Sequence, residues 1–238
     1  MHGSSGPCMH LVKRMNSNEL IAKVIGIVND PDYDTPADIL KFINGSNKRI
    51  ADLLLLPDLK DGFDTVDTTV GEMTAILPET YHKNLFMARV AGKDVDIFKD
   101  TVSLSRVRGG LSLDTGDIAA VATKKGSLIY QKVPTAITEI ELYFYRLPVP
   151  MVIPGEGEDE SLPDGAYGND DFDWAIIHDT CAKIFNEIED GMEGAKVNTE
   201  KHEAKFLEKI ELLDDYAEQQ GKEFPNRPST NLSWLGVK

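Results

Sequence analysis

Apolar residues recur at steps of three and four along residues 170–221, and this spacing predicts two amphipathic helices joined by a short connection. The connection contains Gly191 and Gly194, which suits a helix end that needs a residue tolerant of positive φ. Asn198 or Thr199 is the expected N-cap of the second helix, because either side chain can accept from a free backbone N–H. The two apolar stripes consist of Phe172, Ile176, Ile177, Cys181, Ile184, Phe185 and Ile188 in the first helix and Phe206, Ile210, Leu213 and Ala217 in the second.

The N-terminal part of the chain carries a second helical pattern. Asn16 and Glu19 have the spacing of a capping box, and apolar residues at helical steps follow to about residue 28. Thr35 is the expected N-cap of the next helix, with Pro36 at its first position, where a missing N–H costs nothing. Pro57 ends that helix. The sequence therefore predicts a pair of helices at each end of the chain.

Between about residues 63 and 146 the hydrophobic period changes from 3.6 to 2, which predicts strands. The joints Ala91-Gly92-Lys93 and Lys124-Lys125-Gly126 are typical of hairpins, because glycine allows the positive φ of a tight turn. Seven strands are expected, over residues 65–70, 72–77, 85–90, 95–98, 118–123, 128–133 and 139–146. Strands this short and numerous favour a small antiparallel sandwich or barrel-like sheet.

Together these patterns predict an α+β fold, in which a helical bundle is formed from the N- and C-terminal helices and an antiparallel β-sandwich or barrel-like domain is inserted between them. The expected parts are a flexible leader (1–15), an N-terminal helical part (16–60), the inserted β-domain (61–150), an acidic loop (151–169), a C-terminal helical pair (170–221) and an extended tail (222–238).

The charge is uneven. The chain has a formal net charge of −15, yet residues 81–150 hold ten Lys and Arg against seven Asp and Glu. Residues 154–173 hold eight acidic residues and no basic one, which is typical of a solvated loop. Such a balance argues against gripping nucleic acid through its phosphates. No apolar run approaches the roughly 20 residues of a membrane helix, so we expect no membrane association.

Candidate metal ligands are few. His178 and Cys181 lie three residues apart on a predicted helix, but two ligands without a second cluster make a weak metal site. The more ordinary interpretation of Cys181 is a buried thiol on the apolar stripe. The acidic turn at residues 30–34 imitates a calcium loop, but Thr35 and Lys41 stand where that loop needs Gly and Glu. We therefore predict no metal.

Catalytic patterns are equally weak. The chain contains no phosphate-binding glycine motif and no Gly-x-Ser-x-Gly nucleophile elbow. Glu187, Glu189 and Asp190 could serve as paired carboxylates for acid–base chemistry, but they cluster at a polar helix end. We therefore predict no catalytic residue, no cofactor and no enzyme.

Several stretches resemble the head-to-tail adaptor (connector) proteins of tailed bacteriophages, especially short-tailed ones. The likeness covers about residues 17–220, and its most specific parts are Leu77-Pro78-Glu79-x-Tyr81-His82 and the helix that ends in Glu189-Asp190-Gly191. The stretches that carry it are ADILKFINGSNKRIADLLLLPDL, TAILPETYHKNLFMARV, GSLIYQKVPTAITEIELYFYRLP and WAIIHDTCAKIFNEIEDGMEGAKVNTEKHEAKF.

This resemblance implies a structural virion protein that is made in the host bacterial cytoplasm and assembles at the head–tail interface. Members of the family form a ring, commonly of twelve copies, below the portal. The implied partners are other copies of the chain, the portal protein, and tail nozzle, tail tube or fibre proteins, while DNA passes through the channel without specific binding. The family has no catalytic residues to carry over.

The residues themselves suggest two sites for that role. A channel lined by acidic side chains repels the DNA phosphates, so the DNA would pass without being held. The acidic candidates for this lining are Glu208, Glu211, Asp214 and Asp215. An extended tail with aromatic anchors could dock on the portal. The candidate docking residues are Phe224, Pro225, Trp234 and Leu235.

An alternative from another functional class is a ligand- or glycan-binding β-sandwich module on a helical stem. Tyr130, Tyr143 and Tyr145 could form an exposed aromatic platform for a sugar. The ordinary interpretation of the same tyrosines is half-buried packing within strands. Exposure of the three rings therefore discriminates between these interpretations.

Overall fold

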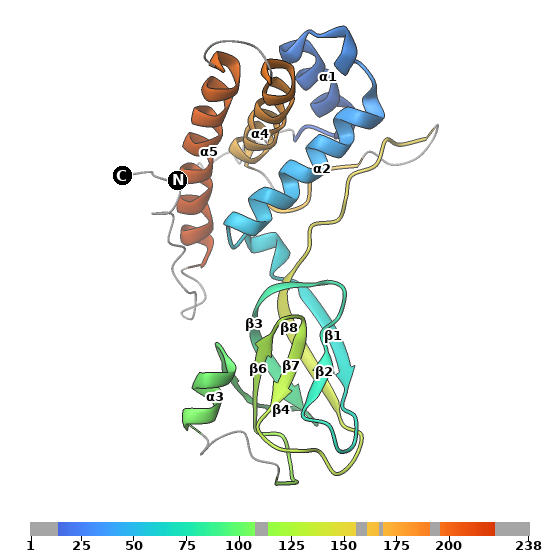
Figure 1. The fold of residues 1–238 in the computed structure, drawn as a ribbon, viewed down its shortest axis with the longest axis vertical. Helices are drawn as coiled ribbons and strands as arrows, with labels where there is room; N and C mark the ends of the chain where they lie inside the picture. Colours follow the sequence, from blue (N-terminus) through green and yellow to red (C-terminus); the bar gives the residue numbers. More distant parts are fainter. Residues whose placement is uncertain (1–13, 108–113, 156–160, 167–168, 191–195, 222–238) are drawn as a thin grey trace, which may run out of the picture. The chain divides into compact units, whose positions relative to one another are not determined.

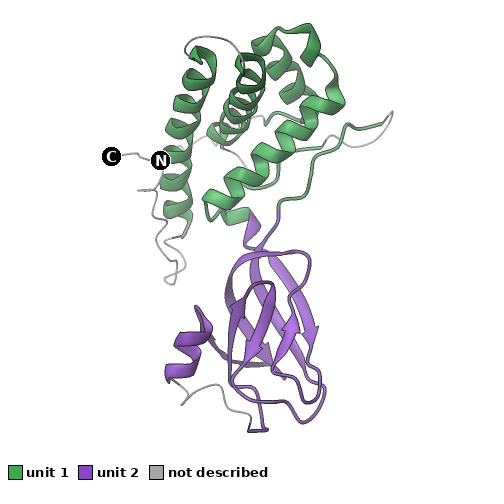
Figure 2. Cartoon of the chain, viewed as in Figure 1, with its two compact units in different colours: residues 1–58, 148–238 green, residues 59–147 purple. Residues whose placement is uncertain are grey.

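The computed structural model describes residues 14–107, 114–155, 161–166, 169–190 and 196–221, and the statements below concern these residues. The chain forms two compact units (Figure 2). The helical unit comprises residues 1–58 and 148–238, and the β unit comprises residues 59–147. The two ends of the chain thus build one unit and the β unit is inserted between them. The predicted α+β fold class is confirmed, with two open sheets rather than a closed barrel.

The helical unit contains α1 (Ser17–Val28), α2 (Pro36–Leu53), α4 (Asp170–Glu189) and α5 (Val197–Gly221), with the 3-10 turn η1 (Pro31–Tyr33) (Figure 1). A second 3-10 turn, η2 (Pro57–Leu59), spans the boundary between the two units. The capping box is confirmed. The Asn16 side chain accepts from the Glu19 N–H at 2.8 Å, and the Glu19 carboxylate accepts from the Asn16 N–H at 3.1 Å. Thr35 is the N-cap of α2, although its side chain makes no capping hydrogen bond. No described helix is both long enough and apolar enough to cross a bilayer.

Helix α4 lies at the centre of the helical unit, in contact with α1, α2 and α5. Twelve of its twenty residues are buried, so its buried surface is much wider than the single apolar stripe that the sequence predicts. The buried set includes polar residues as well as the expected apolar ones, among them Asp173, His178 and Asp179. Because buried polar groups need partners, α4 must bring these residues close to partners within the helical unit.

Helix α5 begins at Val197, so the expectation that Asn198 or Thr199 is its N-cap is wrong. Both residues lie in the first turn and donate their backbone N–H groups to the Glu189 carboxylate, at 3.0 and 3.2 Å. The Thr199 hydroxyl also donates to Glu189, at 2.7 Å, and this bond lowers the pKa of Glu189. A carboxylate from the end of α4 therefore satisfies the free N–H groups at the start of α5.

The segment after the β unit is tied to the N-terminal helices. Asn44 on α2 donates to the Met151 carbonyl at 2.9 Å and accepts from the Met151 N–H at 2.8 Å. The Ser17 hydroxyl on α1 donates to the Val152 carbonyl at 2.9 Å. Asp164 accepts from the Val149 N–H at 2.8 Å. The described part of the predicted acidic loop is thus hydrogen-bonded to the bundle.

The β unit is a sandwich of two four-stranded sheets. The first has the order β1 (Gly62–Asp67), β8 (Glu139–Arg146), β3 (Tyr81–Val90), β4 (Lys93–Asp94). The second has the order β2 (Thr74–Ile76), β7 (Ser127–Tyr130), β6 (Ala120–Lys124), β5 (Asp96–Phe98). All pairs are antiparallel except β5 and β6. Alternate residues of β8 (Ile140, Leu142 and Phe144) point into the core between the sheets.

Local chemistry explains the hairpins, while tertiary packing explains a helix that the sequence does not predict. Ala91 and Gly92 have φ of 50° and 72°, and Lys125 and Gly126 have φ of 49° and 77°, which confirms both expected turns. Helix α3 (Thr101–Val107) follows β5 directly. It packs on β5 and β6 and buries Leu104 against the side of the second sheet that faces away from the core.

Candidate interaction surfaces

A buried carboxylate joins three helices. Asp179 on α4 is fully buried and forms ion pairs with Arg49 on α2 and, at 2.6 Å, with Lys183 one turn along α4. The Arg49 guanidinium also lies 4.7 Å from the centre of the Phe206 ring on α5. The Lys183 ammonium further donates to the Ser46 hydroxyl at 3.1 Å. A buried charge is tolerated only when it is paired, so this cluster fixes how α2, α4 and α5 pack together.

A histidine pair lies on the seam between α4 and α5. The Nδ1 atoms of His178 and His202 are 3.2 Å apart, so one ring donates and the other accepts. Trp174 and Phe185 stack on the two sides of this pair, with ring centres 5.6 and 5.4 Å away. Burial lowers the pKa of His178 to about 4, with added repulsion from His202 and nearby lysines. Burial also lowers the pKa of His202.

This geometry argues for packing rather than metal binding. His178 faces His202, not Cys181. Burial raises the pKa of the Cys181 thiol to about 12, which confirms the buried thiol and makes it a poor ligand. Among the described residues, no three His, Cys, Asp or Glu side chains are grouped as a metal site.

The three carboxylates that the sequence places at the end of α4 do not act together. Glu189 caps α5, Asp190 pairs with Lys196 at 3.1 Å, and Glu187 accepts from the Tyr33 hydroxyl at 2.9 Å. Each is used separately in packing, so this arrangement offers no acid–base pair.

The candidate channel-lining residues lie on α5, where they differ in exposure. Glu208, Glu211 and Asp215 are exposed and lie at helical steps of three and four, so they share one face of α5. Asp214 is half-buried beside that face. The channel-lining role of all four stays a prediction. The candidate docking residues Phe224, Pro225, Trp234 and Leu235 lie outside the described residues.

The aromatic platform needed for the glycan alternative does not form as expected. Tyr130 is fully buried in the sandwich core and Tyr145 is 8% exposed. Burial raises the pKa of Tyr130 to about 12. Tyr143 is half-buried, with its ring centre 5.0 Å from that of Phe63. Only one of the three rings is therefore accessible, and the packing interpretation fits better.

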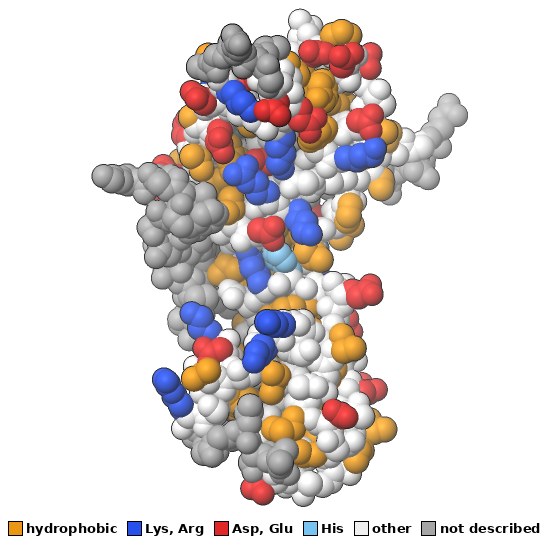
Figure 3. All heavy atoms as spheres, viewed as in Figure 1, with side chains coloured by type: hydrophobic (Ala, Val, Ile, Leu, Met, Phe, Trp, Pro, Cys, Tyr) orange, Lys and Arg blue, Asp and Glu red, His pale blue; other side chains and the backbone are white. Residues whose placement is uncertain are grey.

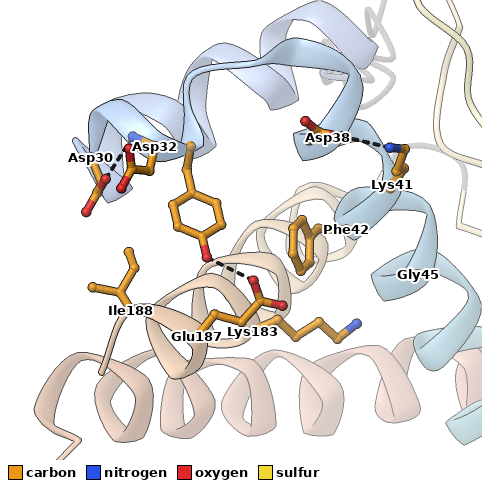
Figure 4. Close-up of a pocket in the computed structure, with 10 residues that line it drawn as sticks. Asp30, Asp32, Asp38, Lys41, Phe42, Gly45, Lys183, Glu187 and Ile188 are labelled. Atoms are coloured by element: carbon orange, nitrogen blue, oxygen red, sulfur yellow. Dashed lines mark hydrogen bonds and ion pairs between the residues drawn. The ribbon is translucent and has the colours of Figure 1, made fainter. Parts of the chain in front are cut away.

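The helical unit contains a cleft of about 790 Å³ that the sequence patterns did not reveal. It is formed by η1, α2 and the C-terminal half of α4 (Figure 4). The half-buried rings of Tyr33 and Phe42 line it, with centres 6.5 Å apart, and Ile188 adds an aliphatic side. Glu187 reaches in from α4 to accept from Tyr33. The acidic turn that imitates a calcium loop thus forms the rim of a partly apolar hollow.

The cleft is electrostatically negative. Its two lysines are neutralised, Lys41 by Asp38 at 2.7 Å and Lys183 by Asp179. The other three acidic lining residues are Asp30, Asp32 and Glu187. Within the described part of the chain, none of their carboxylates forms an ion pair. The hydrogen bond to Glu187 raises the pKa of Tyr33, and burial and the charges of all three carboxylates act in the same direction. The cleft can therefore attract a cationic or aromatic group.

Comparison with known proteins gives one clear result. The family model described as SU10 adaptor protein matches residues 15–229 and so spans both units. No curated protein matches the chain.

Proposed function

The chain belongs to the SU10 adaptor protein family, and on that premise we propose that it forms a homo-oligomeric ring below the portal of a short-tailed phage. In this proposal about twelve copies extend the DNA channel and present a surface to which tail nozzle, tail tube or fibre proteins attach. The phage head–tail adaptor role follows from the family, and the match across residues 15–229 is the observation that carries the proposal. The ring, the portal and tail proteins that contact it, and a purely structural role without catalysis are all part of what we propose.

The distribution of charge supports this role. The helical unit holds twenty-eight Asp and Glu against fourteen Lys and Arg, whereas the β unit holds twelve against eleven. Nearly all of the net negative charge thus belongs to the helical unit. A wall of this sign repels phosphates, so DNA can slide without being held. We assign the channel wall to the helical unit, with Glu208, Glu211 and Asp215 facing the DNA.

The near-neutral β unit suits the other task, which is attachment of tail proteins. Phe63 on β1 is 54% exposed and packs beside Tyr143 on β8, and the Arg89 guanidinium lies 5.9 Å from the Tyr143 ring centre. Exposed aromatic and arginine side chains are typical anchors of protein interfaces. We assign this sheet face to a tail-side partner.

The ring is tested by mixing the purified chain with purified portal and imaging the mixture by negative stain. We expect rings on the portal with the full chain and none with Trp234→Ala/Leu235→Ala. Asn231→Ala/Ser233→Ala is the matched control, which changes two polar tail residues and should leave binding intact. A full chain that never binds the portal overturns the proposal, whereas binding by the Trp234→Ala/Leu235→Ala variant overturns only the docking role of the tail.

The channel is tested by reversing charge on α5. Assembled rings that carry Glu208→Lys, Glu211→Lys and Asp215→Lys should retain double-stranded DNA in a gel-shift assay at low salt, where unmodified rings retain none. Reversal at Asp67, Glu72 and Glu79, which are exposed in the β unit, is the control. Equal DNA retention by both triple variants would show that the α5 face does not line the channel.

A further inference from the structure

We propose that the end of the C-terminal tail, residues 234–238, occupies the cleft of its own chain until a portal is present. The inference rests on the proposed function, because it assigns a resting place to the segment that is proposed to reach the portal. The occupant is thus a named segment of this chain, and its release would couple portal binding to exposure of the tail.

Charge is the first argument. Residues 222–238 hold Lys222, Arg227 and Lys238 against Glu223, a net charge of +2. The rest of the helical unit has a net charge of −16, from eleven basic and twenty-seven acidic residues. Opposite net charges raise the local concentration of the tail near the helical surface before any specific contact forms.

Side-chain chemistry selects the cleft from the rest of that acidic surface. The sequence 234–238 is Trp-Leu-Gly-Val-Lys, which places a large ring, aliphatic groups and one cation close together. The cleft offers the rings of Tyr33 and Phe42, the aliphatic side chain of Ile188, and a group of carboxylates that no described lysine or arginine neutralises. A Trp side chain can stack on such rings while Lys238 approaches the carboxylates. By contrast, Glu208, Glu211 and Asp215 on α5 are not among the residues that line this cleft.

The length of the tail is the third argument. Because Glu189 at the end of α4 caps the start of α5, the two helices run in opposite directions and Gly221 lies at the far end of the bundle from the cleft. Helix α5 is about 36 Å long at 1.5 Å per residue. The thirteen residues from Gly221 to Trp234 can span at most about 45 Å, whereas the six to Arg227 span about 20 Å. Only the last part of the tail can therefore reach the cleft of the same chain.

The tail and the portal would then compete. A portal site that binds Trp234 and Leu235 must displace them from the cleft. The apparent affinity for the portal is therefore the intrinsic affinity multiplied by the fraction of chains whose cleft is empty. Weakening the cleft contact should thus tighten portal binding, a result that a purely structural role for the cleft residues does not predict.

A photo-crosslinking amino acid at position 236 of the full chain, which leaves Trp234 and Leu235 in place, tests this directly. We expect crosslinks, mapped by mass spectrometry, to peptides that contain residues 30–45 or 183–188. A mixture of isotopically labelled and unlabelled copies should give crosslinks within one chain only. Crosslinks that lie elsewhere, or that join labelled to unlabelled copies, overturn the proposal.

Matched charge variants sharpen the test. Asp30→Asn/Asp32→Asn/Glu187→Gln keeps hydrogen-bond acceptors at all three positions but removes the charge of the cleft, and should lower the crosslink yield at least fivefold. Asp170→Asn/Glu200→Gln/Glu218→Gln removes three charges from exposed positions of α4 and α5 and should leave the yield unchanged. Equal yields from the two variants contradict a cleft-specific contact.

Adding portal separates this inference from the proposed function. If crosslinks move from the cleft to the portal, both stand. If they stay in the cleft, the tail does occupy the cleft, but its release by the portal and portal docking by the tail both fail. If they reach the portal but never the cleft, the docking proposal stands and this inference is overturned.

Discussion

Lowering the pH should loosen the seam between α4 and α5 through the histidine pair. His178 and His202 face each other in a buried site, with the ammonium groups of Lys201, Lys205 and Lys209 close enough to disfavour a second positive charge. One proton can be shared between the two Nδ1 atoms, but two protonated rings would repel each other. The folded chain therefore resists protonation at the site where the unfolded chain accepts it.

The magnitude follows from the pKa of His178, which is 6.5 ordinarily and about 4 when folded. Because the folded pKa is depressed, the stabilisation is complete above pH 6.5 and is lost as the pH falls towards 4. At pH 5 the unfolded side chain is almost fully protonated and the folded one almost unprotonated, which lowers the free energy of unfolding by about 2 kcal/mol. The lowered pKa of His202 acts in the same direction.

Urea unfolding at pH 7 and pH 5 measures this effect. Trp174 fluorescence reports on the helical unit, and a Trp234→Phe background removes the other tryptophan. The free energy of unfolding should fall from pH 7 to pH 5, and this fall should be smaller by at least about 2 kcal/mol in His178→Gln/His202→Gln than in its parent. His82→Gln, a histidine of β3 in the β unit, should change nothing. If the double variant and its parent lose equal stability at pH 5, the histidine pair is not the acid-sensitive element.

Three further predictions concern packing. Asp179→Asn should destabilise the helical unit by about 2–4 kcal/mol, because Arg49 loses its buried partner, and a small effect in urea unfolding would mean that solvent already screens the pair. Tyr130→Phe should leave the β unit as stable or stabilise it by about 1 kcal/mol in calorimetry, since the buried hydroxyl has no hydrogen-bond partner among the described residues; marked destabilisation would reveal one. Gly62→Ala should destabilise the β unit by at least about 2 kcal/mol, because a Cβ there would lie 2.6 Å from the Phe144 carbonyl oxygen, and a normal melting temperature would contradict that packing.

The sequence predicts those features whose causes are local. The capping box of Asn16 and Glu19, the prolines at helix starts and the glycines of both hairpins act over a few residues, so their outcome can be derived without the rest of the chain. Helix α3 is different, because its seven residues are held by Leu104 against Ala120 and Ala122 of β6. Its existence depends on contacts across the sheet, which hydrophobic spacing alone does not encode.

The candidate sites divide in the same way. His202 and Arg49 find their partners 24 and 130 residues away, so no local pattern points to either contact. One signal was available, since Asp179 lies four residues before Lys183, the spacing of an ion pair on a helix. The cleft combines a turn, α2 and α4, and its rings come from residues that look like ordinary core positions in the sequence.

The burial of α4 also restricts how a ring could be built. Two of its carboxylates act inside the bundle, where Asp179 pairs with Arg49 and Asp173 accepts from the Met15 N–H at 2.8 Å. A helix enclosed by α1, α2 and α5 has little surface left to meet DNA. Helix α5, by contrast, has its buried residues on one side and the exposed Glu208, Glu211 and Asp215 on the other. In the proposed ring, α4 would therefore hold the wall together from inside, while α5 would set the charge that DNA meets.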